Sequence, residues 1–124
     1  MSVLPDAAGA GVVLWLMLAG ACGAVLRLAC DHWLPRGGIL LANVAGSLVA
    51  GLVIGLQPSA DATTLWVTGF CGALTTFSTV STATADDVLR GRWGTAARTW
   101  ALHLGLGALA VVLGLLSGSA LSAA

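Results

Sequence analysis

The chain contains no glutamate, no lysine and no tyrosine, and charged residues make up only 8% of its 124 positions. Soluble domains carry about 25% charged residues. Hydrophobic residues reach 58% here, and the mean hydropathy is +0.99. These values exclude a water-soluble monomer and predict an integral membrane protein.

The formal net charge is zero, and no run of basic residues is present. Binding to nucleic acid depends on neutralising phosphates with clustered Lys or Arg. We therefore expect no nucleic-acid partner.

No carboxylate falls within a long apolar stretch. The five aspartates lie in tails or connectors, at Asp6, Asp31, Asp61, Asp86 and Asp87. Proton-coupled exporters need an acidic relay inside the membrane, so passive conduction fits better. Phosphate-binding and dinucleotide-binding glycine patterns are also missing, and the sequence predicts no enzyme.

Charged residues divide the chain into four apolar segments near the length of about 20 residues that a membrane span requires. The segments cover residues 12–30, 39–57, 63–85 and 95–117, and together they form one domain over residues 1–124. The first eleven residues carry Asp6 and no basic residue, unlike the start of a signal peptide. We therefore expect the first segment to be retained.

Basic residues are confined to the first and third connectors and their flanks, as Arg27, Arg36, Arg90, Arg92 and Arg98. Basic residues near membrane spans favour the cytoplasmic side. We predict a multi-pass protein of the cell membrane, with connectors 31–38 and 86–94 in the cytoplasm and both termini outside.

The third segment contains Gly69 and Gly72, followed by a run in which seven of the ten residues from Thr75 to Thr84 are hydroxylic. Glycine loosens a membrane helix, and Ser or Thr can satisfy the backbone groups that a break releases. A break near residues 72–76 would expose carbonyls able to bind a cation. The alternative is close helix packing through small residues.

Three polar side chains fall within or beside the other segments. The Asn43 amide either links two helices or lines a pathway, where its NH₂ could replace part of the hydration shell of an anion. His103 either lines the same pathway or bonds a neighbouring hydroxyl. Arg27 either extends to the membrane surface or attracts anions into a vestibule.

Three motifs resemble those of the Fluc (CrcB) family of small dimeric fluoride channels. They are GACGAVLR at 20–27, GGILLANVAGSLVAGL at 37–52 and, most specific, GFCGALTTFST at 69–79. The resemblance implies an all-α fold with four transmembrane helices, the third interrupted, in an antiparallel dimer. It also implies a fluoride-specific channel that exports cytoplasmic fluoride passively.

The resemblance further implies a structural sodium ion at the dimer interface, held by the backbone carbonyls of Gly72 and Thr75. It places Asn43 and Phe77 on the fluoride pathway, because the positive edge of a phenyl ring can face a small anion. We add Ser81 of the hydroxylic run and His103 to this pathway.

Two departures from the family pattern affect the choice of partner. Val80 stands where the family has a second phenylalanine, and Thr99 aligns with its pore tyrosine. An antiparallel homodimer also needs chains that insert in both orientations, which the arginine bias opposes. We therefore predict a heterodimer with a sister subunit; the alternatives are a dual-topology homodimer and a non-conducting assembly protein.

Overall fold

The structure is a computed structural model that describes residues 7–35 and 37–124. Predictions that rest on residues 1–6 or on Arg36, namely the character of the N-terminal tail and part of the arginine bias, lie outside the described residues. Every regular element of the described part is a helix, and this part contains no strand. Its elements are α1 (Ala7–Trp33), α2 (Gly38–Leu56), α3 (Ala60–Thr63), η1 (Thr64–Cys71), α4 (Gly72–Leu74), α5 (Ser78–Leu89) and α6 (Trp93–Ser122).

Three of these helices are long and apolar enough to cross a membrane, and they contain residues 9–33, 38–56 and 93–122. The fourth predicted segment is built from two shorter pieces, α3–η1–α4 and α5, separated by residues 75–77. The prediction of an all-α membrane protein with a broken third segment is therefore confirmed.

The first and last helices extend beyond the predicted segments, to Ala7–Trp33 and Trp93–Ser122. The boundaries of the predicted segments were set at charged residues, which mark where a helix leaves the hydrocarbon core of the membrane. Polar residues can continue the helix into water, because its backbone hydrogen bonds are made within the segment.

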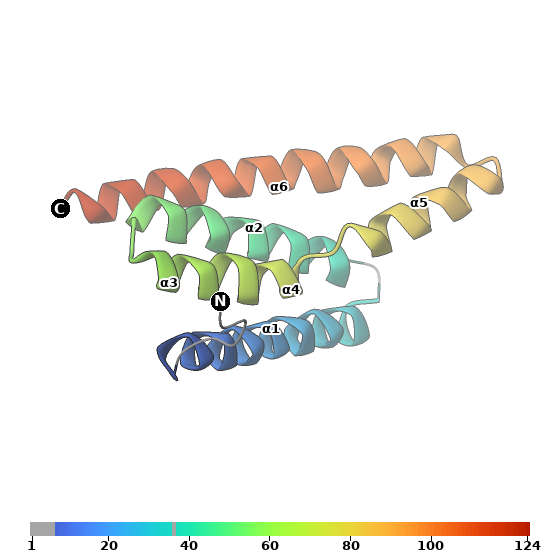
Figure 1. The fold of residues 1–124 in the computed structure, drawn as a ribbon. Coiled ribbons are helices and arrows are strands. Elements are labelled where there is room, and N and C mark those ends of the chain that lie inside the picture. Colours follow the sequence, from blue (N-terminus) through green and yellow to red (C-terminus); the bar gives the residue numbers. More distant parts are fainter. Residues whose placement is uncertain (1–6, 36) are drawn as a thin grey trace, which may run out of the picture.

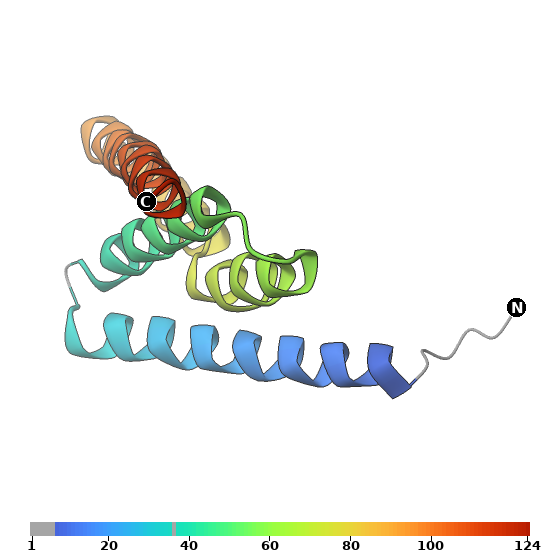
Figure 2. The same cartoon turned by 90° about the vertical axis from the view of Figure 1, so that its left-hand side faces the viewer.

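The helices form a stack in which α6 packs on α2, and α2 and α3–η1–α4 lie side by side against α1, as Figures 1 and 2 show from two sides. After the break, α5 leaves this stack and packs against the first part of α6 (Figure 1). The start of α1 and the C-terminus lie at one end of the bundle, and the α1–α2 and α5–α6 turns lie at the other.

Glycines bring α2 and α6 into backbone contact. Gly51 and Gly55 of α2 face Gly114 and Gly118 of α6, and a methyl group at any of these positions would overlap a carbonyl of the opposite helix. Lipid tails are as apolar as the side chains, so close packing of small residues replaces the hydrophobic effect in joining membrane helices. This contact holds α6 against the side of α2 that carries Asn43.

The chain buries little apolar surface on its own. The buried hydrophobic residues of the described part are mostly small or medium in size, and no large side chain is fully covered. Many leucines, valines and tryptophans on α1 and α6 are exposed. Such a surface suits contact with lipid tails and with a second subunit.

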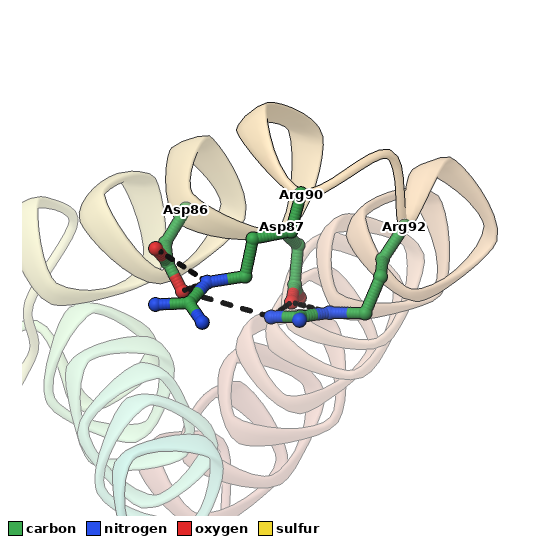
Figure 3. A network of polar contacts seen from close by, with 4 residues as sticks. All are labelled: Asp86, Asp87, Arg90 and Arg92. Carbon is green, nitrogen blue, oxygen red and sulfur yellow. Dashed lines mark hydrogen bonds and ion pairs between the residues drawn. The ribbon is translucent and has the colours of Figure 1, made fainter.

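Ion pairs join α5 to the turn before α6 (Figure 3). Arg90 Nε lies 2.8 Å from an Asp86 carboxylate oxygen, and an Arg92 guanidinium nitrogen lies 2.6 Å from Asp87 Oδ1. Gly91 makes this turn with a φ of 74°, in the left-handed region that favours glycine. Exposed pairs of this kind contribute about 0–1 kcal/mol each, so they fix the turn more than they stabilise the fold.

Candidate functional site

The third segment breaks at Thr75, which has an extended backbone with φ −82° and ψ 156°. The helix before it ends with two bonds to one carbonyl, because both the Thr75 N–H and the Thr75 hydroxyl donate to Cys71 O, at 2.9 and 3.0 Å. β-Branched residues lose rotamer freedom in a helix, and a hydroxyl can compete for backbone groups. Both effects favour ending the helix here, at the C-terminal edge of the predicted range.

Asn43 of α2 binds both polar groups of the Thr76 backbone. The Thr76 N–H donates to Asn43 Oδ1 at 2.7 Å, and Asn43 Nδ2 donates to Thr76 O at 3.1 Å. In a continuous helix the Thr76 N–H would donate to the carbonyl of Gly72. The amide therefore replaces helical bonding at the break and releases the Gly72 carbonyl from its usual donor.

Close packing of α2 on the break brings Asn43 within reach. Gly46, nearly one turn after Asn43, leaves room for the methyl group of Thr75 and for Leu74, and a side chain at this position would meet both. Residues three apart share a helix face. The small residue thus allows the contact, and the amide on the same face forms the hydrogen bonds.

Thr76 also begins the second half of the segment. Its Oγ1 accepts from the Thr79 N–H at 3.3 Å and lies 3.2 Å from Ser78 Oγ. A threonine that accepts from the N–H three residues later is a favoured helix N-cap. Our sequence reasoning did not single out Thr76, although the Thr-x-x-Thr spacing within the hydroxylic run is the signal that could have identified it.

Asn43, Phe77 and His103, three of the four predicted pathway residues, line one hollow of about 240 Å³. We call it the Asn43 hollow. The rest of its lining is Ser47, Thr75, Thr76, Val80, Trp100 and Leu104. Val80, the residue at the position of the second family phenylalanine, is only 4% exposed. The lining of this hollow contains no charged side chain.

His103 forms a hydrogen bond with Asn43, since its Nδ1 lies 3.0 Å from Asn43 Nδ2. The orientation of the amide is fixed by Thr76, whose backbone N–H can only donate and must face the amide oxygen. Asn43 Nδ2 is therefore the donor to His103, and Nδ1 is the acceptor. We had considered a hydroxyl partner for His103, and the structure gives it the amide instead.

Phe77 packs edge-to-face against Trp100 of α6, with ring centroids 5.4 Å apart. The phenyl side chain is also 72% exposed, the largest exposure among the predicted pathway residues. Trp100 was not among the predicted pathway residues. Here it supplies a second aromatic ring beside Phe77, on a different helix from Val80.

A second hollow of about 430 Å³ lies against α1 and contains Arg27. We call it the Arg27 hollow. Thr76, Ser78 and Thr79 line it together with Asp31, and Thr76 also lines the Asn43 hollow. Within the described ranges Arg27 forms no ion pair. A hydroxyl-lined space that holds one cationic and one anionic side chain, Arg27 and Asp31, therefore adjoins the uncharged hollow at the break.

Ser81, the fourth predicted pathway residue, does not line the Asn43 hollow. Its Oγ is buried and is the one such side-chain atom in the described part without a hydrogen-bond partner. Thr84 on the same helix instead donates to the carbonyl of Val80, four residues earlier. The Ser81 hydroxyl is therefore a donor without an acceptor among residues 7–35 and 37–124.

The predicted sodium ligands lie at the break itself. Gly72 opens the last turn before it, and Thr75 is the extended residue. The released Gly72 carbonyl and the extended backbone supply oxygen donors of the type that coordinates alkali ions at broken membrane helices. Over residues 7–35 and 37–124, no group of three or more His, Cys, Asp or Glu side chains could hold a metal instead.

Comparison with known proteins gives the same assignment over most of the chain. Residues 14–115 match the family described as CrcB-like protein, Camphor Resistance (CrcB). A fluoride-specific ion channel FluC of Deinococcus radiodurans is 43% identical over 87% of this chain and 95% of its own length. FluC 2 of Cutibacterium acnes is 40% identical over 86% and 97%, and FluC 1 of Symbiobacterium thermophilum is 38% identical over 84% and 96%.

Proposed function

Because this chain belongs to the CrcB family, as its motifs predicted, we propose that it is a subunit of a fluoride-specific channel that lets fluoride leave the cytoplasm passively. The relatives are named as ion channels, in line with the prediction that the chain is not an enzyme. The observation that carries the proposal is an uncharged amide, Asn43, held at the break where two hollows meet.

The two hollows suit two stages of anion transfer. Arg27 forms no ion pair within the described residues and attracts anions to its side of the hollow, while Asp31 in the same lining offsets part of that attraction. The neighbouring hydroxyls then offer neutral donors, and the Asn43 amide adds one when its contact with His103 opens. Neutral donors can replace hydration without holding the ion as strongly as a cation would. The edge of the Phe77 ring carries partial positive charge, so it can face the anion at the next position along the pathway.

We further propose that the backbone carbonyls of Gly72 and Thr75 hold a structural sodium ion between two subunits. The support is the released Gly72 carbonyl and the extended Thr75 backbone. The ion would contribute positive charge beside the break and hold the two breaks together. The proposed transfer of fluoride from the Arg27 hollow to Phe77 does not involve this ion.

Replacing sodium by a large organic cation such as N-methylglucamine is therefore expected to weaken the dimer and to slow fluoride efflux at least severalfold. The measurement is the dimer fraction by size-exclusion chromatography, with efflux recorded in parallel. Potassium serves as the matched small-cation control. If the dimer fraction and the efflux are both unchanged in N-methylglucamine, the proposal of a structural sodium ion is wrong.

The partner we propose is an antiparallel sister subunit. Phe77 is largely exposed, so it lies where a second subunit could complete the site. Some relatives carry numbered names, FluC 1 and FluC 2. Arg27, Arg90, Arg92 and Arg98 also favour one orientation, with connectors 31–38 and 86–94 in the cytoplasm and both termini outside the cell membrane.

The experiment that tests the function is fluoride efflux from liposomes, measured with an electrode, for this chain alone and co-expressed with a sister subunit. We expect efflux from the pair and little from the chain alone. Efflux from the chain alone would instead establish the dual-topology homodimer. No efflux from either sample would favour a non-conducting assembly protein. A fluoride-specific channel must also release fluoride from the liposomes without releasing chloride.

A further inference from the structure

The contact between Asn43 and His103 commits both hydrogens of the amide. One is donated to Thr76 O at 3.1 Å and the other points at His103 Nδ1, 3.0 Å away. A neutral amide has two N–H donors and no more. In this arrangement Asn43 therefore has no free donor for an anion, although it is the residue on which the proposed pathway depends.

The same contact defines the state of the imidazole. Nδ1 can accept a hydrogen bond only when it carries no proton, so this contact requires neutral His103 with its hydrogen on Nε2. When Nδ1 is protonated it becomes a donor, and two donors cannot bond one another. Protonation must then break the contact and leave the Asn43 Nδ2–H and the His103 Nδ1–H facing a common point.

We propose that His103 is a proton-dependent positioning residue for Asn43: neutral His103 occupies the amide, and protonated His103 releases it and forms with it a two-donor site for fluoride. This inference rests on the proposed function. No bond other than hydrogen bonds changes, and the proton stays on the imidazole. Fluoride thereby binds preferentially to the protonated form, and lower pH favours its entry.

The surroundings leave His103 as the titrating group of this site. His103 forms its hydrogen bond with Asn43 of α2. The hollow that it lines also contains Ser47 of α2, Thr75, Thr76, Phe77 and Val80 of the break and α5, and Trp100 and Leu104 of α6. None of these residues is charged. Arg27 and Asp31 line the hollow on the other side of Thr76, and Arg98 lies more than one turn earlier on α6.

Binding linkage gives a direct test. If fluoride prefers the protonated form, then fluoride must raise the pH at which His103 titrates, by thermodynamic reciprocity. The chain has only two histidines, and the other, His32, is exposed at the end of α1. The variant H32Q therefore leaves a single histidine whose ring nitrogens can be followed by ¹⁵N NMR in lipid bilayers, from about pH 5 to 8.

We expect the Nε2–H form at alkaline pH, and a titration midpoint that fluoride raises by about half a unit or more, equal to about threefold preference for the protonated form. Chloride at the same concentration should leave the midpoint in place. An Nδ1–H form at alkaline pH would overturn the inference. So would a midpoint that fluoride does not move, or that chloride moves equally.

Efflux provides the second readout and separates this inference from the proposed function. After subtraction of leak from protein-free liposomes, efflux through the channel should rise severalfold as pH falls, in the wild type and in H32Q. H103Q keeps a hydrogen-bonding side chain that does not titrate, and its efflux should not change with pH. A pH profile in H103Q like that of the wild type would overturn the inference while leaving the channel function intact. Absence of efflux at every pH from this chain co-expressed with a sister subunit would refute the channel function, and the NMR titration would still decide the role of His103.

Discussion

Replacement of Asn43 by alanine is expected to reduce fluoride efflux by about 30-fold or more. The variant removes the acceptor for the Thr76 N–H and the donor to Thr76 O in one step. A buried backbone group left without a partner costs about 1–3 kcal/mol, and each 1.4 kcal/mol corresponds to about a factor of ten. The break then loses both its geometry and its uncharged donor. The measurement is efflux from liposomes containing matched amounts of folded protein.

Ser59→Ala is the matched control for this variant. Ser59 Oγ accepts from the Ala62 N–H at 3.3 Å and caps α3, at the other end of the same segment. S59A therefore also deprives a backbone N–H of its side-chain acceptor, but in an exposed position where water can replace it. Efflux near the wild-type rate is expected. Equal efflux from N43A and S59A would show that the fluoride pathway does not depend on the amide.

Replacement of Gly114 by valine is expected to destabilise the chain by about 3 kcal/mol or more, at the upper end of the cost of overpacking. The new side chain would overlap the Leu48 carbonyl and the Leu52 N–H on α2. These are backbone atoms, so no change of rotamer can relieve the overlap and the two helices must separate. The measurement is the temperature at which the monodisperse protein is lost in mild detergent.

Gly105→Val offers a comparison on the same helix. A Cβ at Gly105 meets nothing within 4 Å in the described chain, so α6 and α2 keep their contact. Both variants make the same change in helix propensity, and only the packing differs. Equal destabilisation by G105V and G114V would mean that the contact between α2 and α6 does not hold the fold together.

The fold was predictable because membrane insertion depends on composition over long stretches. Asp31, Asp61 and the pair Asp86–Asp87 mark the ends of apolar runs, and the runs became helices. The break was predictable because glycine and hydroxylic residues are rarely gathered in a lipid-facing helix. Helix ends were less well predicted, since α1 continues past Asp31 and α6 begins before the expected residue.

The contacts at the break could not be derived from the sequence. Thr76 lies 33 positions after Asn43 and His103 lies 60 positions after it, and only the packing of α2 between the third segment and α6 brings the three residues together. The eight-residue π-helical segment Thr64–Cys71 was not predicted either. Its wider turns depend on i→i+5 bonding, which has no strong local sequence signal, although such segments occur often at functional sites.

The hairpin formed by α5 and the start of α6 projects beyond the ends of α1 and α2 (Figure 1) and carries the Asp86, Asp87, Arg90 and Arg92 ion pairs at its tip. In an assembly of two oppositely oriented copies, this tip would emerge on both faces of the membrane. Beside a sister subunit of different sequence, it would emerge on one face only. Binding of an antibody fragment raised against the tip therefore measures how many copies of the tip lie on each face of the cell membrane. This number distinguishes the two assemblies without any transport measurement.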